Sequence, residues 1–295
     1  MTDIREKIKE SAILTEKALI SYCKEGDEEL SELFDSERYS LLAGGKRIRP
    51  FIVNEVCRAL GGDVNVAVAY GAALEMIHTY SLIHDDLPCM DDDDMRRGKP
   101  TNHKVFGYST ALLAGDALLT KAFLTAASNP YGTDEQNCKA VRLIAEAAGE
   151  CGMIGGQIID LAGEQKKLEF EQLLRLHRLK TGALIRCAAC LGALSAGYSE
   201  GSDVYRQAEA YADGIGLAFQ VIDDILDATA TEEELGKSVG GDAERGKTTF
   251  LTYFDVGGAM DYARELTDGA VRSISNWQYP ETLSELAYYL LERKN

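Results

Sequence analysis

Two aspartate clusters, each at the end of an apolar run, restrict how this chain can fold. Asp85, Asp86 and Asp91 follow the apolar residues 80–84, and Asp223, Asp224 and Asp227 follow the apolar residues 216–222. A carboxylate that is removed from water without a partner is strongly disfavoured. Carboxylates about 5 Å apart also repel each other by about 3 kcal/mol at an effective dielectric near 20. The fold must therefore supply cations to both clusters, and Mg²⁺ is the cation that prefers ligand sets made only of oxygens.

Helical periodicity dominates the sequence, and the alternation that is typical of strands is scarce. Short glycine-containing turns separate most of the predicted helices, and no linker of disordered composition interrupts them. Two longer irregular stretches, 87–107 and 229–249, each follow an aspartate cluster, and long loops in compact domains are often functional. The sequence predicts one all-α domain over residues 1–295. Its helices should cover about 4–22, 28–41, 48–60, 64–86, 109–127, 135–160, 169–197, 203–228, 258–275 and 280–292.

The formal net charge of −17 argues against nucleic acid or an anionic membrane as the main partner, because both would repel the chain. No apolar run reaches the roughly 18 residues of a membrane-spanning helix, and the first residues lack the apolar core of a signal peptide. We therefore expect a cytoplasmic protein without stable membrane insertion. Among the seven cysteines, Cys187 and Cys190 have metal-ligand spacing but no second pair, so the cysteines indicate small buried residues in a reducing compartment.

An anionic substrate would need positive charge gathered locally, and the sequence gathers it in two places. Gly44 and Gly45 lead into Lys46, Arg47 and Arg49 at a predicted helix start, which is a natural anion site. The spacing differs from that of a P-loop, so nucleotide binding is not indicated.

The second basic group is the pair Arg96 and Arg97, which directly follows the acidic run. These arginines could neutralise that run through exposed salt bridges, each worth at most about 1 kcal/mol. Alternatively, their planar guanidinium forks bind phosphate oxygens. The acidic residues 92–94 exceed what a metal site requires, and we do not assign all of them to metal.

Spacing predicts how the carboxylates of each cluster meet. Asp223 and Asp227 are four residues apart, so they share one helix face. Asp85 and Asp91 are six residues apart, which on a straight helix places them about 120° out of register. Pro88 should break the helix between them, and that break can bring Asp91 back toward Asp85.

With both clusters, the glycine–basic turn and the arginine pair in place, the chain resembles the trans-isoprenyl diphosphate synthases along essentially its whole length. Within that family it is most similar to the bacterial farnesyl diphosphate synthase group. So many separated matches in the right order argue against chance. They comprise residues 44–50, 81–91, 96–101, 155–160, 180–184, 219–227 and 236–237.

The resemblance implies an isoprenoid synthase fold with a central active-site cavity, in a homodimer. It also implies head-to-tail condensation of isopentenyl diphosphate with an allylic diphosphate, assisted by three Mg²⁺ ions. The metal ligands would be Asp85, Asp86, Asp91, Asp223, Asp224 and Asp227. The allylic diphosphate would contact Arg96, Lys180, Lys237 and Lys247, and isopentenyl diphosphate would contact Lys46, Arg49, His78 and Arg97.

The chemistry that the resemblance implies is physically sensible. Mg²⁺ and basic side chains would stabilise the departing diphosphate, where negative charge develops. Lys180, Thr181 and Gln220 would face the allylic cation with their dipoles. The departed diphosphate is expected to accept the final proton, so no protein base is required.

Product length is a finer expectation. Tyr80 and Ser81 lie about 6–7.5 Å before Asp85 along the predicted helix, at about 1.5 Å per residue. Helix rotation places Ser81 on the Asp85 face, so spacing alone makes Tyr80 a core aromatic. In the resembling group, an aromatic five residues before the first aspartate, with a two-residue insertion in the cluster, accompanies a C15 product. The chain has both features, which favours farnesyl diphosphate, with C20 geranylgeranyl diphosphate as the alternative.

Other classes explain the sequence less well. A non-catalytic regulatory subunit of a prenyl synthase would be signalled by the loss of an aspartate cluster, and both are intact. A terpene cyclase shares the fold and the first cluster, but its second metal site usually mixes Asn, Ser and Glu. An acidic protein that merely buffers cations would have no need of clustered arginines and lysines.

Overall fold

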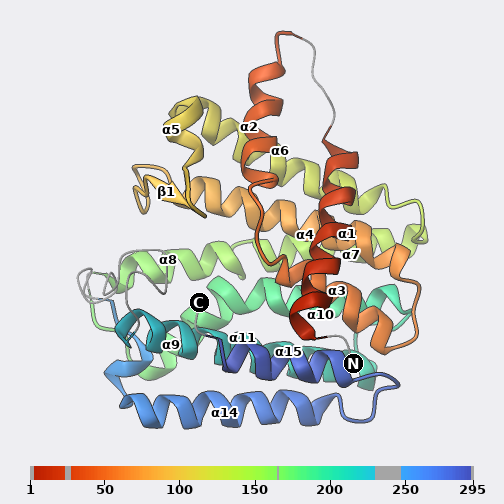
Figure 1. Cartoon of the computed structure of the whole chain (residues 1–295), viewed down its shortest axis with the longest axis vertical. Helices are drawn as coiled ribbons and strands as arrows, with labels where there is room; N and C mark the ends of the chain where they lie inside the picture. Colours follow the sequence, from red (N-terminus) through yellow and green to blue (C-terminus); the bar gives the residue numbers. More distant parts are fainter. Residues whose placement is uncertain (1–2, 24–27, 165, 230–246, 294–295) are drawn as a thin grey trace.

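The computed structural model describes residues 3–23, 28–164, 166–229 and 247–293. These residues are almost entirely helical, with one short antiparallel hairpin, which confirms the predicted all-α fold (Figure 1). The helices are α1 (Ile4–Tyr22), α2 (Ser31–Leu41), α3 (Ile48–Ala59), α4 (Val64–Asp85), α5 (Asn102–Phe106), α6 (Tyr108–Ala127), α7 (Asp134–Ala148), α8 (Met153–Gly163), α9 (Phe170–His177), α10 (Ala183–Ser195), α11 (Asp203–Thr229), α14 (Val256–Ser273) and α15 (Glu281–Leu291). The shorter elements are the π-helix η1 (Arg178–Gly182), the 3-10 helix η2 (Phe250–Thr252), and the strands β1 (Met95–Arg96) and β2 (Lys99–Pro100).

The long helices pack in a stack that runs from α6 through α4, α3, α10 and α11 to α14 (Figure 1). Helix α4 lies inside this stack, so it is apolar on nearly all sides, and Tyr70, Leu74 and Ile77 are fully buried. The first aspartate cluster begins at the last residue of α4, and the second lies near the end of α11. The π-helix η1 contacts α8, α10 and α11, and it lies between the two clusters.

Two of the predicted helices depart from a regular α-helix in the structure. The helix expected over 135–160 is divided into α7 and α8. A Cβ on Gly152 would lie 2.2 Å from the carbonyl oxygen of Ala147, so the backbone at this break requires glycine. The helix expected over 169–197 is continuous but passes through η1 between α9 and α10. Such π-helical turns are rare and occur often at functional sites.

Within the described residues, two helices are long and apolar enough to cross a membrane by length and composition alone, although the sequence predicted none. They are Val64–Asp85 and Tyr108–Ala127, with mean hydropathy 1.3 in each case. The first is 78% buried inside the molecule, so its apolar residues form the core. The second is only 39% buried and keeps an exposed apolar face.

A separate cluster of apolar side chains packs around the part of α11 that carries the second aspartate cluster. It joins α9, the end of α11, η2 and the start of α14, and the fully buried ring of Phe250 belongs to it. The ring of Phe170 meets those of Phe250 and Phe254 edge-on. This packing holds the segment after residue 247 against α11.

Candidate active site

The turn after α4 brings Asp91 back to Asp85, as the position of Pro88 predicted. The backbone N–H of Asp91 donates to the carbonyl oxygen of Asp85 at 2.8 Å, and that of Asp92 donates to Leu87 at 3.2 Å. The three residues of the first cluster therefore lie around one tight turn at the C-terminal end of α4.

The first cluster concentrates negative charge in a partly buried place. Burial raises the pKa of Asp85 to about 6, and repulsion from Asp91 and Asp86 adds to the rise, against the opposing charge of Lys180. The amide of Gln157 donates to Asp85 Oδ1 at 3.0 Å. Among the residues that the structure describes, no cationic side chain forms an ion pair with Asp85. A bound cation would offset the repulsion among these carboxylates and stabilise the ionised form of Asp85.

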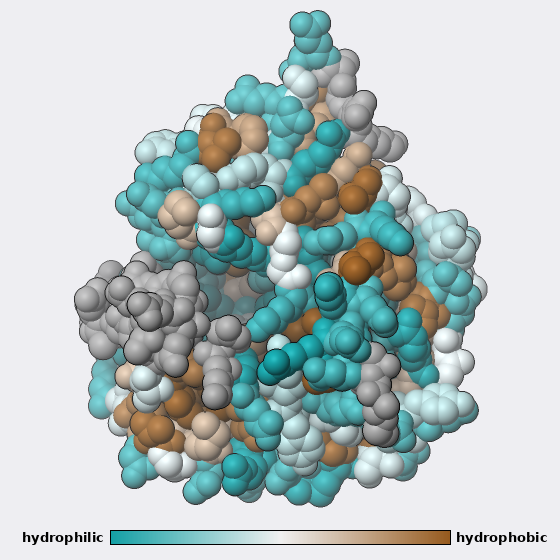
Figure 2. Space-filling model, in the orientation of Figure 1, coloured by the Kyte–Doolittle hydropathy of each residue, from teal (hydrophilic) through white to brown (hydrophobic). Residues whose placement is uncertain are grey.

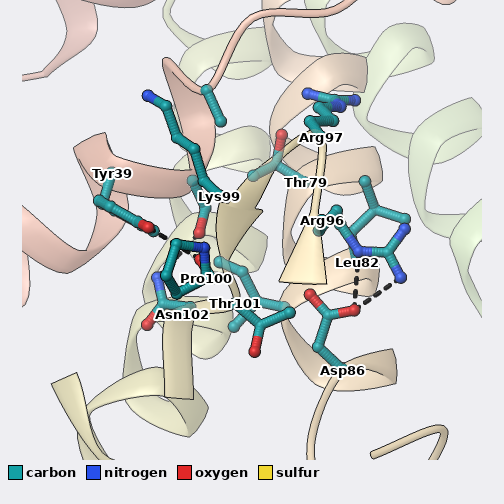
Figure 3. A pocket seen from close by; sticks show the side chains of 13 residues that line it. Tyr39, Thr79, Leu82, Asp86, Arg96, Arg97, Lys99, Pro100, Thr101 and Asn102 are labelled. Atoms are coloured by element: carbon teal, nitrogen blue, oxygen red, sulfur yellow. Dashed lines mark hydrogen bonds and ion pairs between the residues drawn. The ribbon is translucent and has the colours of Figure 1, made fainter. Parts of the chain in front are cut away.

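Arg96 and Arg97 bind different partners. Figure 3 shows their side chains leaving the hairpin of β1 and β2 in different directions. Arg96 donates to Asp86 Oδ1 from Nε at 2.7 Å and from Nη2 at 2.6 Å. Arg97 instead donates to the carbonyl oxygen of Gly44. The cavity between them holds only about 30 Å³, far below the few hundred Å³ of a ligand pocket.

Arg97 joins a second group of cations at the glycine turn before α3. A Cβ on Gly45 would lie 3.0 Å from the guanidinium carbon of Arg97, so glycine lets that group approach the backbone. Burial and then repulsion from Arg49 and Arg97 hold the pKa of His78 well below its usual value. Burial also lowers the pKa of Arg49, and Arg49 Nε is buried with no hydrogen-bond partner in the described structure.

Lys46 extends this cationic group toward the chain termini. Its pKa is lowered by burial and by the charges of Arg293 and Arg5. Arg47, by contrast, is fully buried and donates to Glu75 Oε1 at 2.7 Å, so its charge is already paired. Lys46, Arg49 and Arg97 therefore bring positive charge to the glycine turn, next to His78, which its lowered pKa keeps neutral. These four residues, named the cationic group below, suit a polyanion.

Two carboxylates of the second aspartate cluster accept hydrogen bonds from other parts of the protein. Arg293 Nη2 donates to Asp223 Oδ1 at 2.6 Å, and its guanidinium carbon lies 3.7 Å from the ring centroid of Phe219. Asp224 is buried, and its Oδ2 accepts the backbone N–H of Phe250 at 2.7 Å. These two residues and Asp227 line a cavity of about 130 Å³.

The residues Lys180, Thr181 and Gln220 lie near one another. Thr181 Oγ1 donates to Gln220 Oε1 at 2.9 Å, and Gln220 Nε2 lies 3.4 Å from Asp223 Oδ2. Lys180 Nζ donates to Asp160 Oδ2 at 2.5 Å. The sequence reasoning assigned no role to Asp160 or to Gln157, although both lie in one of the stretches that carried the resemblance.

A larger cavity of about 490 Å³ runs from the first cluster into an apolar region. Figure 2 shows the molecule hollowed at mid-height, in the region between β1 and α9 of Figure 1. Tyr80 and Ser81 both line this cavity, so Tyr80 is not only a core residue. Its ring meets His84 edge-on, with 5.7 Å between centroids. The other lining residues are Arg49, His78, Leu82, His84, Asp85, Met90, Asp116, Leu119, Met153, Ile154, Gln157, Ile158, Leu161, Lys180 and Thr181.

The donor sets of the two clusters fit divalent cations, since both consist of carboxylate oxygens. Asp85 lines the larger cavity, and the whole second cluster lines the cavity of about 130 Å³. In the described residues, ligand-type atoms approach within 4.8 Å in one group of three, formed by Asp92, Asp94 and His103. Asp94 in that group pairs with Lys104 at 2.7 Å. Each of the two aspartate clusters would therefore have to close further around an ion. Lys237, which was expected to contact the allylic diphosphate, lies outside the described residues.

Comparison with known proteins places these features in a family. A family model described as polyprenyl synthetase matches residues 31–274. The farnesyl diphosphate synthase of Escherichia coli is 46% identical over 265 residues, covering 88% of each chain. Geranylgeranyl pyrophosphate synthase 9 of Arabidopsis thaliana is 45% identical over 268 residues, covering 88% of this chain and 74% of that one.

Solved structures agree with the sequence relatives. An FPP/GFPP synthase from Zymomonas mobilis superposes with a TM-score of 0.87 and 34% identity, over 98% of both chains. A geranylgeranyl pyrophosphate synthetase from Pyrococcus horikoshii gives a TM-score of 0.88 with 31% identity, again over 98% of both chains.

Proposed function

Because the chain belongs to the polyprenyl synthetase family and is a trans-prenyl diphosphate synthase, we propose that it makes farnesyl diphosphate. Its substrates are isopentenyl diphosphate and an allylic diphosphate, dimethylallyl or geranyl. The observation that carries the proposal is the cavity that starts at Asp85 and Lys180, between the two clusters, and passes Tyr80. A charged end for the diphosphate and an apolar interior for the prenyl chain are what this substrate needs.

Divalent cations, which we take to be three Mg²⁺ ions, supply positive charge to the leaving diphosphate. Asp85, Asp91 and Asp223 are the ligands that lie on both sides of the site. Lys180, Lys247 and Arg96 then bind the allylic diphosphate, and Thr181 and Gln220 present their dipoles to the carbon from which it departs.

The cationic group at the glycine turn binds isopentenyl diphosphate. Lys46→Ala should raise the Michaelis constant for isopentenyl diphosphate more than that for the allylic substrate, because Lys46 directly follows Gly45, against which the guanidinium of Arg97 packs. Steady-state kinetics with each substrate varied in turn measures this. Equal effects on the two constants would remove Lys46 from that site.

The C20 product is the second candidate, because relatives named for C15 and C20 products are almost equally similar, at 46% and 45% identity. Product analysis after incubation with Mg²⁺, isopentenyl diphosphate and geranyl diphosphate separates the two. We expect C15 from the natural chain and longer products from Tyr80→Ala, because the ring stands in the cavity wall. A C15 limit that survives Tyr80→Ala would place the stop elsewhere.

The exposed apolar face of α6 supports a homodimer. Leu113 and Leu124 share that face, since 11 residues are close to three full turns, and they are 57% and 65% exposed. Burying such side chains against a second copy is favourable. Light scattering should give twice the 32.2 kDa mass of the chain, and a monomer would contradict the proposal. A cytoplasmic location remains a proposal as well, which cell fractionation tests.

A further inference from the structure

Helix α8 packs against the π-helix η1 with no side chain between their backbones. A Cβ on Gly156 would lie 2.2 Å from the backbone nitrogen of Lys180, which is backbone rather than a movable side chain. Any other residue at this position would push η1 and its lysine away. Helix α8 is therefore placed to control where Lys180 stands.

Asp160, one turn further along α8, holds two lysines with one oxygen. Its Oδ2 accepts from Lys180 Nζ at 2.5 Å and from Lys247 Nζ at 3.2 Å. Burial alone would raise the pKa of Asp160, but the charges and hydrogen bonds of the two lysines outweigh it, so the pKa lies below its usual value. The carboxylate is thus ionised and only 14% exposed.

Without Asp160, the ammonium groups of Lys180 and Lys247 would repel each other across the cavity of about 130 Å³ at the second aspartate cluster, which both of them line. Glu164 also lies near Lys247, at 3.8 Å, and it is 35% exposed. Asp160 alone contacts both lysines among the described residues, because Lys180 has its ion pair with Asp160 only.

Gln157 connects the same face of α8 to the first cluster. It lies three residues before Asp160, which puts both side chains on one side of the helix. Its amide donates to Asp85 Oδ1 at 3.0 Å. One helix face therefore contacts an aspartate of the first cluster and the lysines beside the second.

We propose that Asp160 is a positioning residue, which fixes the ammonium groups of Lys180 and Lys247 where negative charge develops on the leaving diphosphate. The inference rests on the proposed prenyl transfer at this site. Asp160 adds a negative charge next to an anion site, so it contributes nothing to ground-state attraction. Asp160 instead acts by holding the two ammonium groups in place, since preorganised charges stabilise a transition state without having to reorient.

The test is Asp160→Asn, which keeps the shape and removes the charge. We expect kcat to fall by about 10- to 100-fold, since misplaced groups commonly cost that much. The Michaelis constant for geranyl diphosphate, and the dissociation constant of inorganic diphosphate with Mg²⁺ by calorimetry, should change by less than about threefold. A merely structural role would weaken binding together with kcat.

Glu164→Gln is the matched control on the same helix, and it should leave kcat within about twofold because its contact is longer and more exposed. A double-mutant cycle with Lys247→Met should show that the two losses are not additive. Additive losses, or an unchanged kcat in Asp160→Asn, would overturn the positioning role. A natural chain that elongates no prenyl diphosphate would instead overturn the proposed function.

Discussion

The two aspartate clusters use the same kind of residue but differ in what offsets their charge. In the first, Asp86 pairs with Arg96 ten residues away, and among the side chains that the structure describes Asp85 accepts a hydrogen bond only from the amide of Gln157. In the second, Asp223 pairs with Arg293, seventy residues later in the sequence. Each cluster therefore has one arginine ion pair, but the pairs lie on different carboxylates. Asp85 has no cationic partner among the described residues, whereas a metal that binds Asp223 has to replace Arg293.

We expect the largest effect from substitutions that disable each aspartate cluster in turn. Asp85→Ala and Asp223→Ala should each lower turnover by about 10³-fold or more, because metal-held charge at the leaving group is worth several kcal/mol. Turnover with geranyl diphosphate and circular dichroism are the measurements. Asp261→Ala, an exposed acid on α14, serves as control. If either variant kept its activity and fold, that cluster would not hold the catalytic metal.

The pH dependence of stability should distinguish the clusters next. The pKa of Asp85 is raised from 3.8 to about 6 by burial first, so in the folded, metal-free protein its ionisation is unfavourable. That contribution to stability is complete below about pH 4 and is lost as the pH rises through about 6, amounting to about 3 kcal/mol at most. Urea unfolding in a chelator at several pH values, compared with Asp85→Asn, measures it. A difference between the two proteins that does not vary with pH would contradict this reading.

Asp224 should show that part of the second cluster is structural. Asp224→Ala leaves the buried N–H of Phe250 without its acceptor, which should lower the free energy of unfolding by about 1–3 kcal/mol. Asp224→Asn retains an oxygen acceptor and should lose less. Denaturant unfolding of both variants provides the comparison, and equal stability for the alanine variant would mean that the contact is dispensable.

The smallest effect concerns the internal cation. Arg293→Gln should strengthen Mn²⁺ binding in the absence of substrate by up to about fivefold, because the ion pair with the partly exposed Asp223 is worth about 1 kcal/mol or less. Titration followed by paramagnetic resonance measures this, with Arg272→Gln, on the exposed end of α14, as control. Weaker binding would show that Arg293 helps to assemble the metal site.

The sequence predicted the parts of the site that depend on local patterns. The end of α4 at the first cluster and the return of Asp91 at Pro88 follow from helix spacing and proline geometry. The cationic turn at Gly44 and Gly45 was visible for the same reason, since glycine before a basic helix start is a local signal.

The parts that were missed depend on contacts between distant segments. The π-helical turn at Lys180 does not interrupt the apolar periodicity that marks a helix. Asp160 reads as an ordinary helix acid until two lysines, 20 and 87 residues away, are seen to share it. Arg293 follows the last predicted helix and has no local pattern that indicates a role, yet its guanidinium lies over Phe219.

The contact of Arg293 with Asp223 has a practical consequence for engineering. Lys46 of the cationic group is also close enough to Arg5 and Arg293 for both to lower its pKa, so the two ends of the described chain approach the same mouth. A purification tag, fusion partner or surface tether joined after residue 295 would start two residues beyond Arg293, whose side chain contacts Asp223 of the second aspartate cluster. Attachment through an internal surface loop would leave the reactants' entrance clear.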